Sequence, residues 1–110
     1  MSSPGSMTYL IDQLKAGDRA AVQPLWERYY PRLVALARKR LQGSSRRVSD
    51  QSYVATDAFD SFCRAAEAGR FPSLKDRDDL WSLLVMIAAR KAADLVTYNR
   101  RKKRRGGRVR

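Results

Sequence analysis

The most distinctive chemical feature of the sequence is a run of six consecutive basic residues near its end, residues 100–105 (RRKKRR). The last eleven residues contain eight lysines and arginines and no acid, so they supply 8 of the 12 net positive charges. One interpretation is a solvated tail that keeps the protein in solution, because runs of like charge are often disordered. The density of the charge favours the other interpretation, an anionic partner such as a phosphate backbone.

Two aromatic residues belong to the same predicted helix as the basic run, Trp81 near its start and Tyr98 beside the run. Aromatic rings interleaved with cations stack unpaired bases, which contributes roughly 1 to 3 kcal/mol per base. For Trp81 we favour a position in the core. Tyr98 is equally suited to packing and to base binding, because Thr97 and Asn99 beside it can hydrogen-bond to nucleotide edges or phosphates.

Two pairs of acidic residues are candidates for general acid and base catalysis or for a magnesium site: Asp57 with Asp60, and Asp78 with Asp79. The first pair lies on one helical turn beside Arg64 and suits a protein contact. The second pair lies where a helix begins, and the helix macrodipole favours negative charge there. We therefore predict that no residue is catalytic and that the protein is not an enzyme.

The composition excludes several classes of site. The chain has one cysteine and no histidine, which excludes a disulfide framework, a zinc site of cysteine and histidine, and a histidine general base. Cys63 lies among apolar residues and is expected to be a small buried hydrophobe. Gly106 and Gly107 follow a helix instead of opening one, so no phosphate-binding loop is present. We expect no metal and no cofactor.

The chain has 110 residues, of which 44% are hydrophobic, and both values fit one soluble domain. Residues 1–6 have neither the charged start nor the apolar centre of a secretory signal. No apolar run approaches the length of about 20 residues that spans a bilayer. We expect a cytoplasmic protein with no membrane insertion.

Periodicity and helix breakers predict four helices. The first covers residues 8–16 and ends at Gly17, because glycine adopts the left-handed backbone conformation of a helix cap at little energetic cost. The second runs from Asp18 to about Gln42 on a single apolar stripe, with a bend near Pro31. A loop is expected over residues 43–47.

The third predicted helix begins at Ser49 or Asp50 and stops at Gly69. The fourth covers residues 76–105, with Asp76 as its cap. Because every long element is helical, we predict an all-α fold, a compact bundle of about four helices with a long basic C-terminal helix. The expected organisation is a flexible leader (1–7), a helical domain (8–105) and a basic tail (106–110).

The order of several short motifs resembles a known family. They are residues 15–18 (KAGD), 25–30 (LWERYY), 54–59 (VATDAF) and 76–81 (DRDDLW), followed by Ile87, Ala88 and Asp94 and then the arginines. In this order and spacing they resemble the region-two domain of an extracytoplasmic-function sigma factor. The resemblance covers residues 8–105.

The resemblance implies a bacterial transcription initiation factor. Its third helix would dock on the clamp helices of the largest subunit of core RNA polymerase, and its last helix would recognise and melt the promoter minus-ten element. The residues implied on the polymerase side are Asp57, Phe59, Asp60 and Arg64. The residues assigned to DNA, including those of the basic run, are Arg90, Lys91, Asp94, Thr97, Tyr98, Arg100, Arg101, Lys102, Lys103 and Arg104.

The implied partners are core polymerase, promoter DNA, especially the single-stranded non-template strand, and an anti-sigma factor as a candidate regulator. Members of such a family normally continue into a second helical domain that reads the minus-thirty-five element. Both an excised domain and a short protein acting without that domain fit the sequence. The rival hypothesis is a small basic helical protein that binds nucleic acid without sequence preference.

Overall fold

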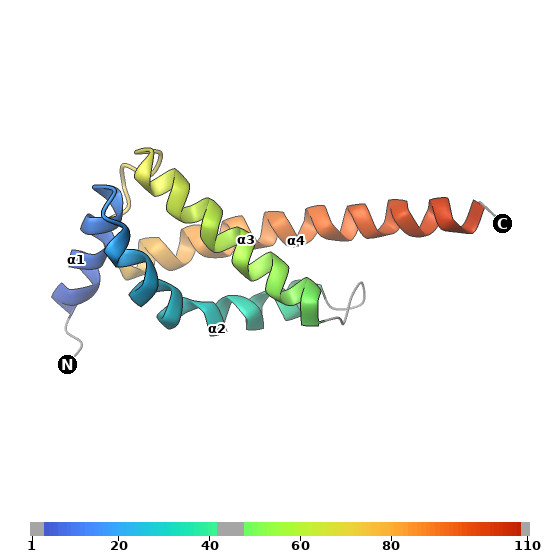
Figure 1. The fold of residues 1–110 in the computed structure, drawn as a ribbon, viewed down its shortest axis with the longest axis horizontal. Helices are drawn as coiled ribbons and strands as arrows, with labels where there is room; N and C mark the ends of the chain where they lie inside the picture. The colour runs from blue at the N-terminus through green and yellow to red at the C-terminus, as the bar shows by residue number, and fades with distance from the viewer. Residues whose placement is uncertain (1–3, 42–47, 109–110) are drawn as a thin grey trace.

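The computed structural model describes residues 4–41 and 48–108, and the side chains of residues 7–41 and 49–102. The elements are α1 (Pro4–Lys15), a 3-10 helix η1 (Arg19–Ala21), α2 (Val22–Arg40), α3 (Val48–Glu67) and α4 (Arg77–Arg108). Within these described residues there is no strand, so the predicted all-α fold with four α-helices is confirmed. Figure 1 shows α3 crossing α4, with α1 at one end of the molecule.

The first helix begins earlier than predicted. It starts at Pro4 and not at residue 8, and proline is favourable at a first helical position because its missing N–H would be unpaired there anyway. Met7 is buried. Residues 4–7, which the sequence assigned to a flexible leader, are therefore part of α1.

The chain reverses between α1 and α2 at Gly17, whose φ of 86° lies in the left-handed region that glycine tolerates. Asp18 follows as the cap of η1, because its Oδ1 accepts a hydrogen bond of 3.0 Å from the amide of Ala20. The side-chain amide of Gln13 donates to Oδ2 of the same carboxylate at 3.0 Å. Asp18 thus links α1 to η1 through its carboxylate, and it stands at a helix start, where the sequence predicted it.

Helix α2 continues through Pro31, which is exposed, and its axis curves along its length in Figure 1. The predicted single helix over 18–42 is confirmed in outline, although its first turn is the separate 3-10 helix. A stripe of buried residues faces the core: Leu25, Tyr29, Leu33 and Ala37. The predicted loop at 43–47 lies outside the described residues.

Helix α3 stops just before Gly69, whose φ is 75°, as the sequence predicted. The segment that follows includes a turn at Pro72 and Ser73. Phe71 stacks on Phe62 of α3 with the ring centroids 5.7 Å apart. Lys15 of α1 donates a hydrogen bond of 2.8 Å to the carbonyl of Leu74. These contacts hold the segment that leads into α4.

The start of α4 is capped by a reciprocal pair of aspartates. The amide of Asp79 donates to Oδ1 of Asp76 at 3.0 Å, and Oδ2 of Asp79 accepts in return from the amide of Asp76 at 3.4 Å and from that of Lys75 at 3.0 Å. Both carboxylates therefore pair with backbone donors that a helix start leaves without partners. The predicted cap at Asp76 is confirmed, and Asp79 has a structural role.

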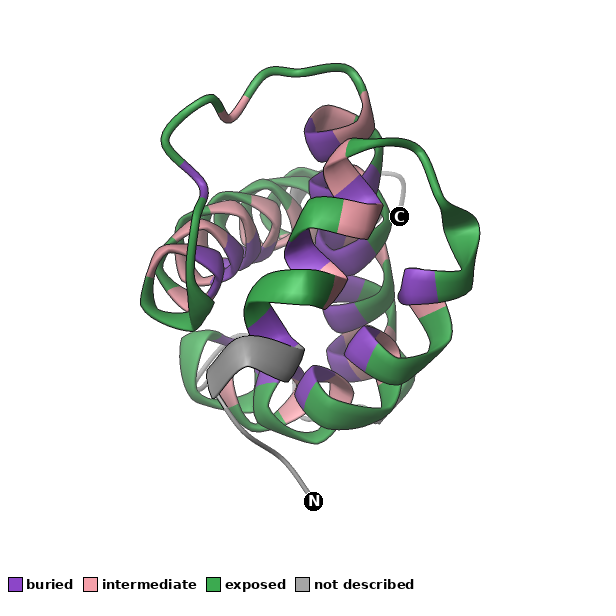
Figure 2. Ribbon diagram, turned by 90° about the vertical axis from the view of Figure 1, so that its left-hand side faces the viewer, coloured by how far each residue is buried: buried purple, intermediate pink, exposed green. Residues whose placement is uncertain are grey.

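The core consists of two clusters of buried residues, and Figure 2 shows the buried positions on the helix faces that meet inside the molecule. The larger cluster joins all four helices around Leu25, Tyr29, Phe62 and Leu84. The smaller cluster contains Ala37, Leu41, Val54 and Ala92. It connects the end of α2, the first half of α3 and the middle of α4.

Beyond the smaller cluster, α4 leaves the body of the protein. Leu95 and Val96 are its last apolar residues that pack on that cluster, and Figure 1 shows the rest of the helix extending past α2 and α3. The helix has 32 residues, and it passes Gly106 and Gly107 to end at Arg108. The predicted end at residue 105 was too early. No helix among the described residues combines the length and the apolar character that a membrane span requires.

Candidate nucleic-acid interface

Four of the residues assigned to DNA form one exposed stripe on α4: Arg90, Asp94, Thr97 and Arg101. Their spacing of four, three and four residues places them on one side of a helix with 3.6 residues per turn. The buried residues Leu84, Ala88 and Ala92 lie on other sides of the same helix. The buried side of α4 therefore fixes the helix in the core, and the stripe on its other side stays exposed to solvent.

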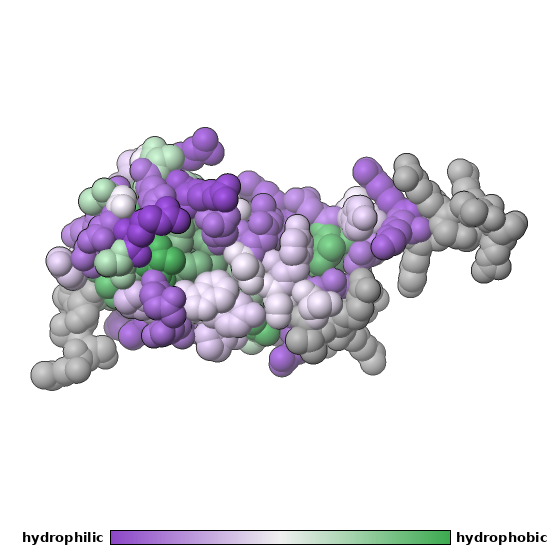
Figure 3. Space-filling view, in the orientation of Figure 1, coloured by the Kyte–Doolittle hydropathy of each residue, from purple (hydrophilic) through white to green (hydrophobic). Residues whose placement is uncertain are grey.

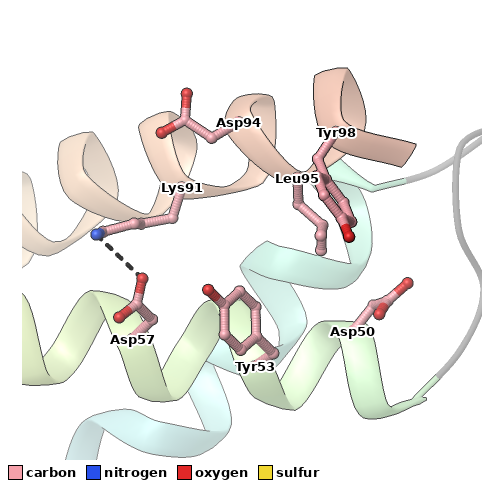
Figure 4. Close-up of a pocket in the computed structure, with 7 residues that line it drawn as sticks. All are labelled: Asp50, Tyr53, Asp57, Lys91, Asp94, Leu95 and Tyr98. Carbon is pink, nitrogen blue, oxygen red and sulfur yellow. Dashed lines mark ion pairs between the residues drawn. The ribbon is translucent and has the colours of Figure 1, made fainter. Parts of the chain in front are cut away.

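Tyr98 lies beside this stripe at the mouth of a pocket between α3 and α4. The pocket has a volume of about 570 Å³ and is lined by Asp50, Tyr53, Asp57, Lys91, Asp94, Leu95 and Tyr98. The rings of Tyr53 and Tyr98 both lie between the two helices, whereas the carboxylate of Asp94 points away from α3 (Figure 4). Tyr98 is 60% exposed and Tyr53 57% exposed, so both rings have free area for stacking.

An ion pair closes one end of this pocket. Nζ of Lys91 lies 3.0 Å from Oδ2 of Asp57, and each side chain is about one-third exposed. The sequence assigned Lys91 to DNA and Asp57 to the polymerase. The structure brings them together, because both lie on the facing sides of α3 and α4. Each therefore has an intramolecular partner, and the pair links the two candidate surfaces.

The basic run continues the exposed end of α4. Arg100, Arg101 and Lys102 are exposed, and hydrophilic side chains cover the described part of α4 at that end in Figure 3. The side chains of Lys103 and Arg104 lie outside the described residues, although their backbone is part of α4. A helix backbone that is anchored at Ala92 fixes where the described cations stand, which a coil does not do.

Helix α3 presents its own exposed stripe, formed by Tyr53, Thr56, Asp60 and Arg64. Asp60 and Arg64 form an ion pair of 3.1 Å on adjacent turns. Phe59, which the sequence placed on the polymerase side, is only 4% exposed and belongs to the larger core cluster. A buried ring offers a partner little area of its own, so Phe59 can contribute only to the floor of this surface.

The sequence of this chain matches one known protein family, described as ECF sigma factor, over residues 4–110. The chain belongs to this family. It is therefore a member of a family of transcription initiation factors, and the family is not one of enzymes. Comparisons with curated proteins and with solved structures find no match.

In this ECF sigma factor, Phe59 forms part of a shallow hollow between α2 and α3. The hollow measures about 240 Å³ and is lined by Arg19, Val22, Gln23, Trp26, Thr56, Phe59, Asp60 and Cys63. The rings of Trp26 and Phe59 meet edge to face at 5.3 Å. The ring of Phe59 therefore forms part of the floor of the hollow next to Asp60.

Cys63 at the edge of this hollow is a buried free cysteine, as the sequence predicted. Burial, together with the negative charges of Glu67 and Asp60, raises the pKa of its thiol to about 12. The nucleophilic thiolate is therefore scarce at neutral pH. Among the described residues, no cluster of histidine, cysteine or carboxylate groups could hold a metal ion.

Trp81 of the sigma factor packs as the sequence favoured. Its ring stacks near Tyr29 with the centroids 6.1 Å apart, and the guanidinium of Arg32 lies over it at 4.2 Å from the ring centroid. Neighbouring groups therefore occupy its surface, so we remove Trp81 as a base-stacking candidate. Tyr98 is the aromatic residue of α4 that keeps its ring exposed.

Sequence reasoning missed three residues of these surfaces: Asp50, Tyr53 and Arg32. The first two had a usable signal, because Asp50, Tyr53 and Asp57 are three and four residues apart and share one face of α3. Arg32 had no local signal. Its contact with Trp81 joins residues of different helices, and only the packing of α2 on α4 creates it.

Proposed function

We propose that this chain is the region-two domain of an ECF sigma factor that docks on core RNA polymerase through α3 and opens the promoter minus-ten element along α4. The observation that carries the proposal is the exposed stripe of α4, with Tyr98 beside it, on a helix whose first half is fixed in the core. Family membership supports the same role. We propose a cytoplasmic site of action.

Strand opening needs no catalytic residue in this proposal. Arg90 and Arg101 attract the phosphate backbone, and an unpaired base enters the pocket between Tyr53 and Tyr98. Stacking contributes roughly 1 to 3 kcal/mol per base, and unpairing costs a few kcal/mol, so captured bases offset the cost of opening. Asp94 provides a hydrogen-bond acceptor on the exposed stripe outside the pocket, where the amino group of a neighbouring base can donate to it.

The polymerase surface in this proposal is the part of the exposed α3 stripe formed by Thr56, Asp60 and Arg64, together with the hollow above Trp26 and Phe59. Asp60 and Arg64 supply charge at its edge. The apolar floor takes a side chain from the clamp helices, which is the usual arrangement of an apolar centre with a polar rim. Asp60 and Arg64 follow Tyr53 by about two and three turns of α3, so polymerase can be bound there while a base occupies the pocket beside Tyr53.

The DNA part is tested by selection from random 12-nucleotide single strands in the presence of core polymerase. We expect fixed bases at a few positions, and we expect the selected strand to outcompete a scrambled strand of equal length. Selection that enriches no sequence, or equal competition, would favour the rival hypothesis of binding without sequence preference. In that case the basic run would bind through phosphates alone.

The polymerase part is tested by capture on core polymerase. Asp60→Lys should lower the captured amount, because it reverses a charge on the exposed stripe of α3. Asp12→Lys makes the same charge change on the exposed side of α1 and should leave capture unchanged. If both variants are captured like the parent protein, the docking surface is not on α3. Asp57 is a poor choice for this test because its replacement also removes the contact with Lys91.

A further inference from the structure

A second cationic surface lies between the later part of α2 and the start of α4. It is a groove of about 510 Å³, lined by Arg32, Ala35, Leu36, Arg38, Lys39 and Trp81. Three of the six lining side chains are cations and none is an acid. The groove therefore has a net positive charge of three, with an apolar floor.

The groove is distinct from the exposed stripe of α4. Trp81 at the groove and Arg90 of the stripe are nine residues apart, which is a rotation of about 900° or two and a half turns. The two residues thus lie on opposite sides of α4. A ligand on the stripe does not reach the groove, and the cations of the groove have no role in the function proposed above.

Arg32 is held in place by two aromatic rings. Its guanidinium carbon lies 4.2 Å from the centroid of Trp81 and 5.6 Å from that of Tyr29. A guanidinium over a ring is attracted by the negative ring face, and its N–H donors point outward in its own plane. Holding the side chain in advance reduces the entropy lost on binding an oxyanion. Arg32 is thus prepared to bind a phosphate.

The spacing of the cations fits a polymer with regular charge. Arg32 and Lys39 are seven residues apart, which is about 10 Å along the helix axis. Each strand of a DNA duplex carries one phosphate per about 3.4 Å of helix axis, and an extended strand carries fewer phosphates over the same length. Two to three consecutive phosphates can therefore meet the groove. Its charged side chains carry donors and no acceptors, which suits phosphate oxygens, and contacts to phosphates carry no sequence information.

We propose that the groove formed by Arg32, Arg38, Lys39 and Trp81 binds the phosphate backbone of single-stranded DNA, independently of sequence and separately from the α4 stripe. It gives the domain a second grip on an unwound strand. Ala35 and Leu36 give the groove an apolar surface for the sugars. An acidic protein segment is the competing occupant, and the experiment decides between the two.

The first measurement is the salt dependence of binding to a 15-nucleotide strand of deoxythymidine, without polymerase. Arg38→Gln with Lys39→Gln should weaken binding and reduce the slope of log affinity against log salt by about 1.4, or about 0.7 for each phosphate that is no longer neutralised. The control is Arg70→Gln with Lys75→Gln, which also removes one arginine and one lysine, both exposed and outside the groove, the α4 stripe and the polymerase surface. A slope equal to that of the control would overturn the proposal.

The second measurement uses Trp81 as a local reporter in a Trp26→Phe background, where it is the remaining tryptophan. The strand should change its fluorescence, because a phosphate on Arg32 alters the charge above the ring. An unchanged spectrum at saturation contradicts the proposal. A 15-residue polyglutamate that changes the spectrum when the strand does not would assign the groove to an acidic protein. Since the strand has no promoter sequence and polymerase is absent, these outcomes are separate from failure of the minus-ten or docking tests.

Discussion

The two halves of α4 belong to one continuous helix, but the first half packs in the core and the second half is exposed to solvent. In the first half, Leu80, Leu84, Ala88 and Ala92 are at most 1% exposed and pack against α2 and α3. In the second half, Thr97, Tyr98, Arg100 and Arg101 are exposed. One continuous helix therefore has a part that stabilises the fold and a part that is available to a ligand.

This division explains how the cations can stand close together on an ordered element. Like charges on neighbouring turns repel each other by a few tenths of a kcal/mol per pair. Burial of a leucine side chain contributes roughly 1.5 to 3 kcal/mol. A few leucines in the first half are enough to offset the repulsion in the second. Stability and binding should then respond to different substitutions, and four predictions test this separation.

The largest effect is expected in the buried half. Leu84→Ala should lower the free energy of unfolding by about 2 to 5 kcal/mol, because it removes buried methyl groups and leaves a cavity. Urea denaturation followed by circular dichroism measures this. Met86→Ala is the matched control on the same helix, since Met86 is 47% exposed, and its effect should be within about 0.5 kcal/mol. Similar losses in the two variants would show that the first half is not the anchor.

The exposed half should behave in the opposite way. Arg100→Ala with Arg101→Ala should leave unfolding unchanged within about 0.5 kcal/mol, because alanine favours the helix and both side chains are exposed. Affinity for single strands should fall at every sequence, and the salt slope should drop by about 1.4, because two phosphates are no longer neutralised. Arg19→Ala with Arg64→Ala is the control. An unchanged slope would mean that the run serves solubility alone.

The same division marks what sequence could predict. Helix positions and the buried stripe of α2 follow from apolar spacing. Gly17, Gly69 and Asp76 ended or capped the helices as predicted, because each acts on the backbone within a few residues of its own position. The start of α1 and the end of α4 were misjudged. The proline at the start of α1 and the two glycines near the end of α4 look like helix boundaries in the sequence. Both residue types are nevertheless compatible with the ends of a helix.

The surface could be predicted only in part. Charge located the basic run. The resemblance to the family assigned Arg90, Asp94, Thr97 and Arg101 to DNA, and the structure shows that they share one exposed side of α4. The sequence did not indicate that Asp57 pairs with Lys91, that Tyr53 faces Tyr98, or that Arg32 covers Trp81. Each of these pairs joins two helices, so it depends on how the helices rotate and cross, which periodicity within one helix leaves open.

Tyr98 should contribute to binding and little to stability. Tyr98→Ala should weaken binding of a selected single strand by roughly 1 to 3 kcal/mol, about 5-fold to 150-fold, because the stacking surface is removed. Tyr98→Phe should keep most of the affinity, because it keeps the ring. Tyr9→Ala serves as a control, since Tyr9 is also exposed, at 63%, but lies on α1. If the alanine and phenylalanine variants bind equally, the ring is not a stacking surface.

The smallest effect is expected at the ion pair of Asp57 and Lys91, which joins α3 to α4 where the helix changes from buried to exposed. A double-mutant cycle with alanine at each position should give a coupling of about 0.2 to 1 kcal/mol in unfolding. The exposed pair of Asp60 and Arg64 is the comparison, and its coupling should be at or below about 0.5 kcal/mol.

Added salt separates the two pairs further. Screening weakens exposed charge pairs more than partly buried ones, so the coupling of Asp60 and Arg64 should fall more steeply with salt than that of Asp57 and Lys91. The same cycle measured on strand affinity asks whether the pair also orients the pocket beside Tyr98. If the two residues are coupled in strand affinity but not in the free energy of unfolding, the ion pair serves the binding half of α4. If they are coupled in the free energy of unfolding but not in strand affinity, the pair serves the anchoring half.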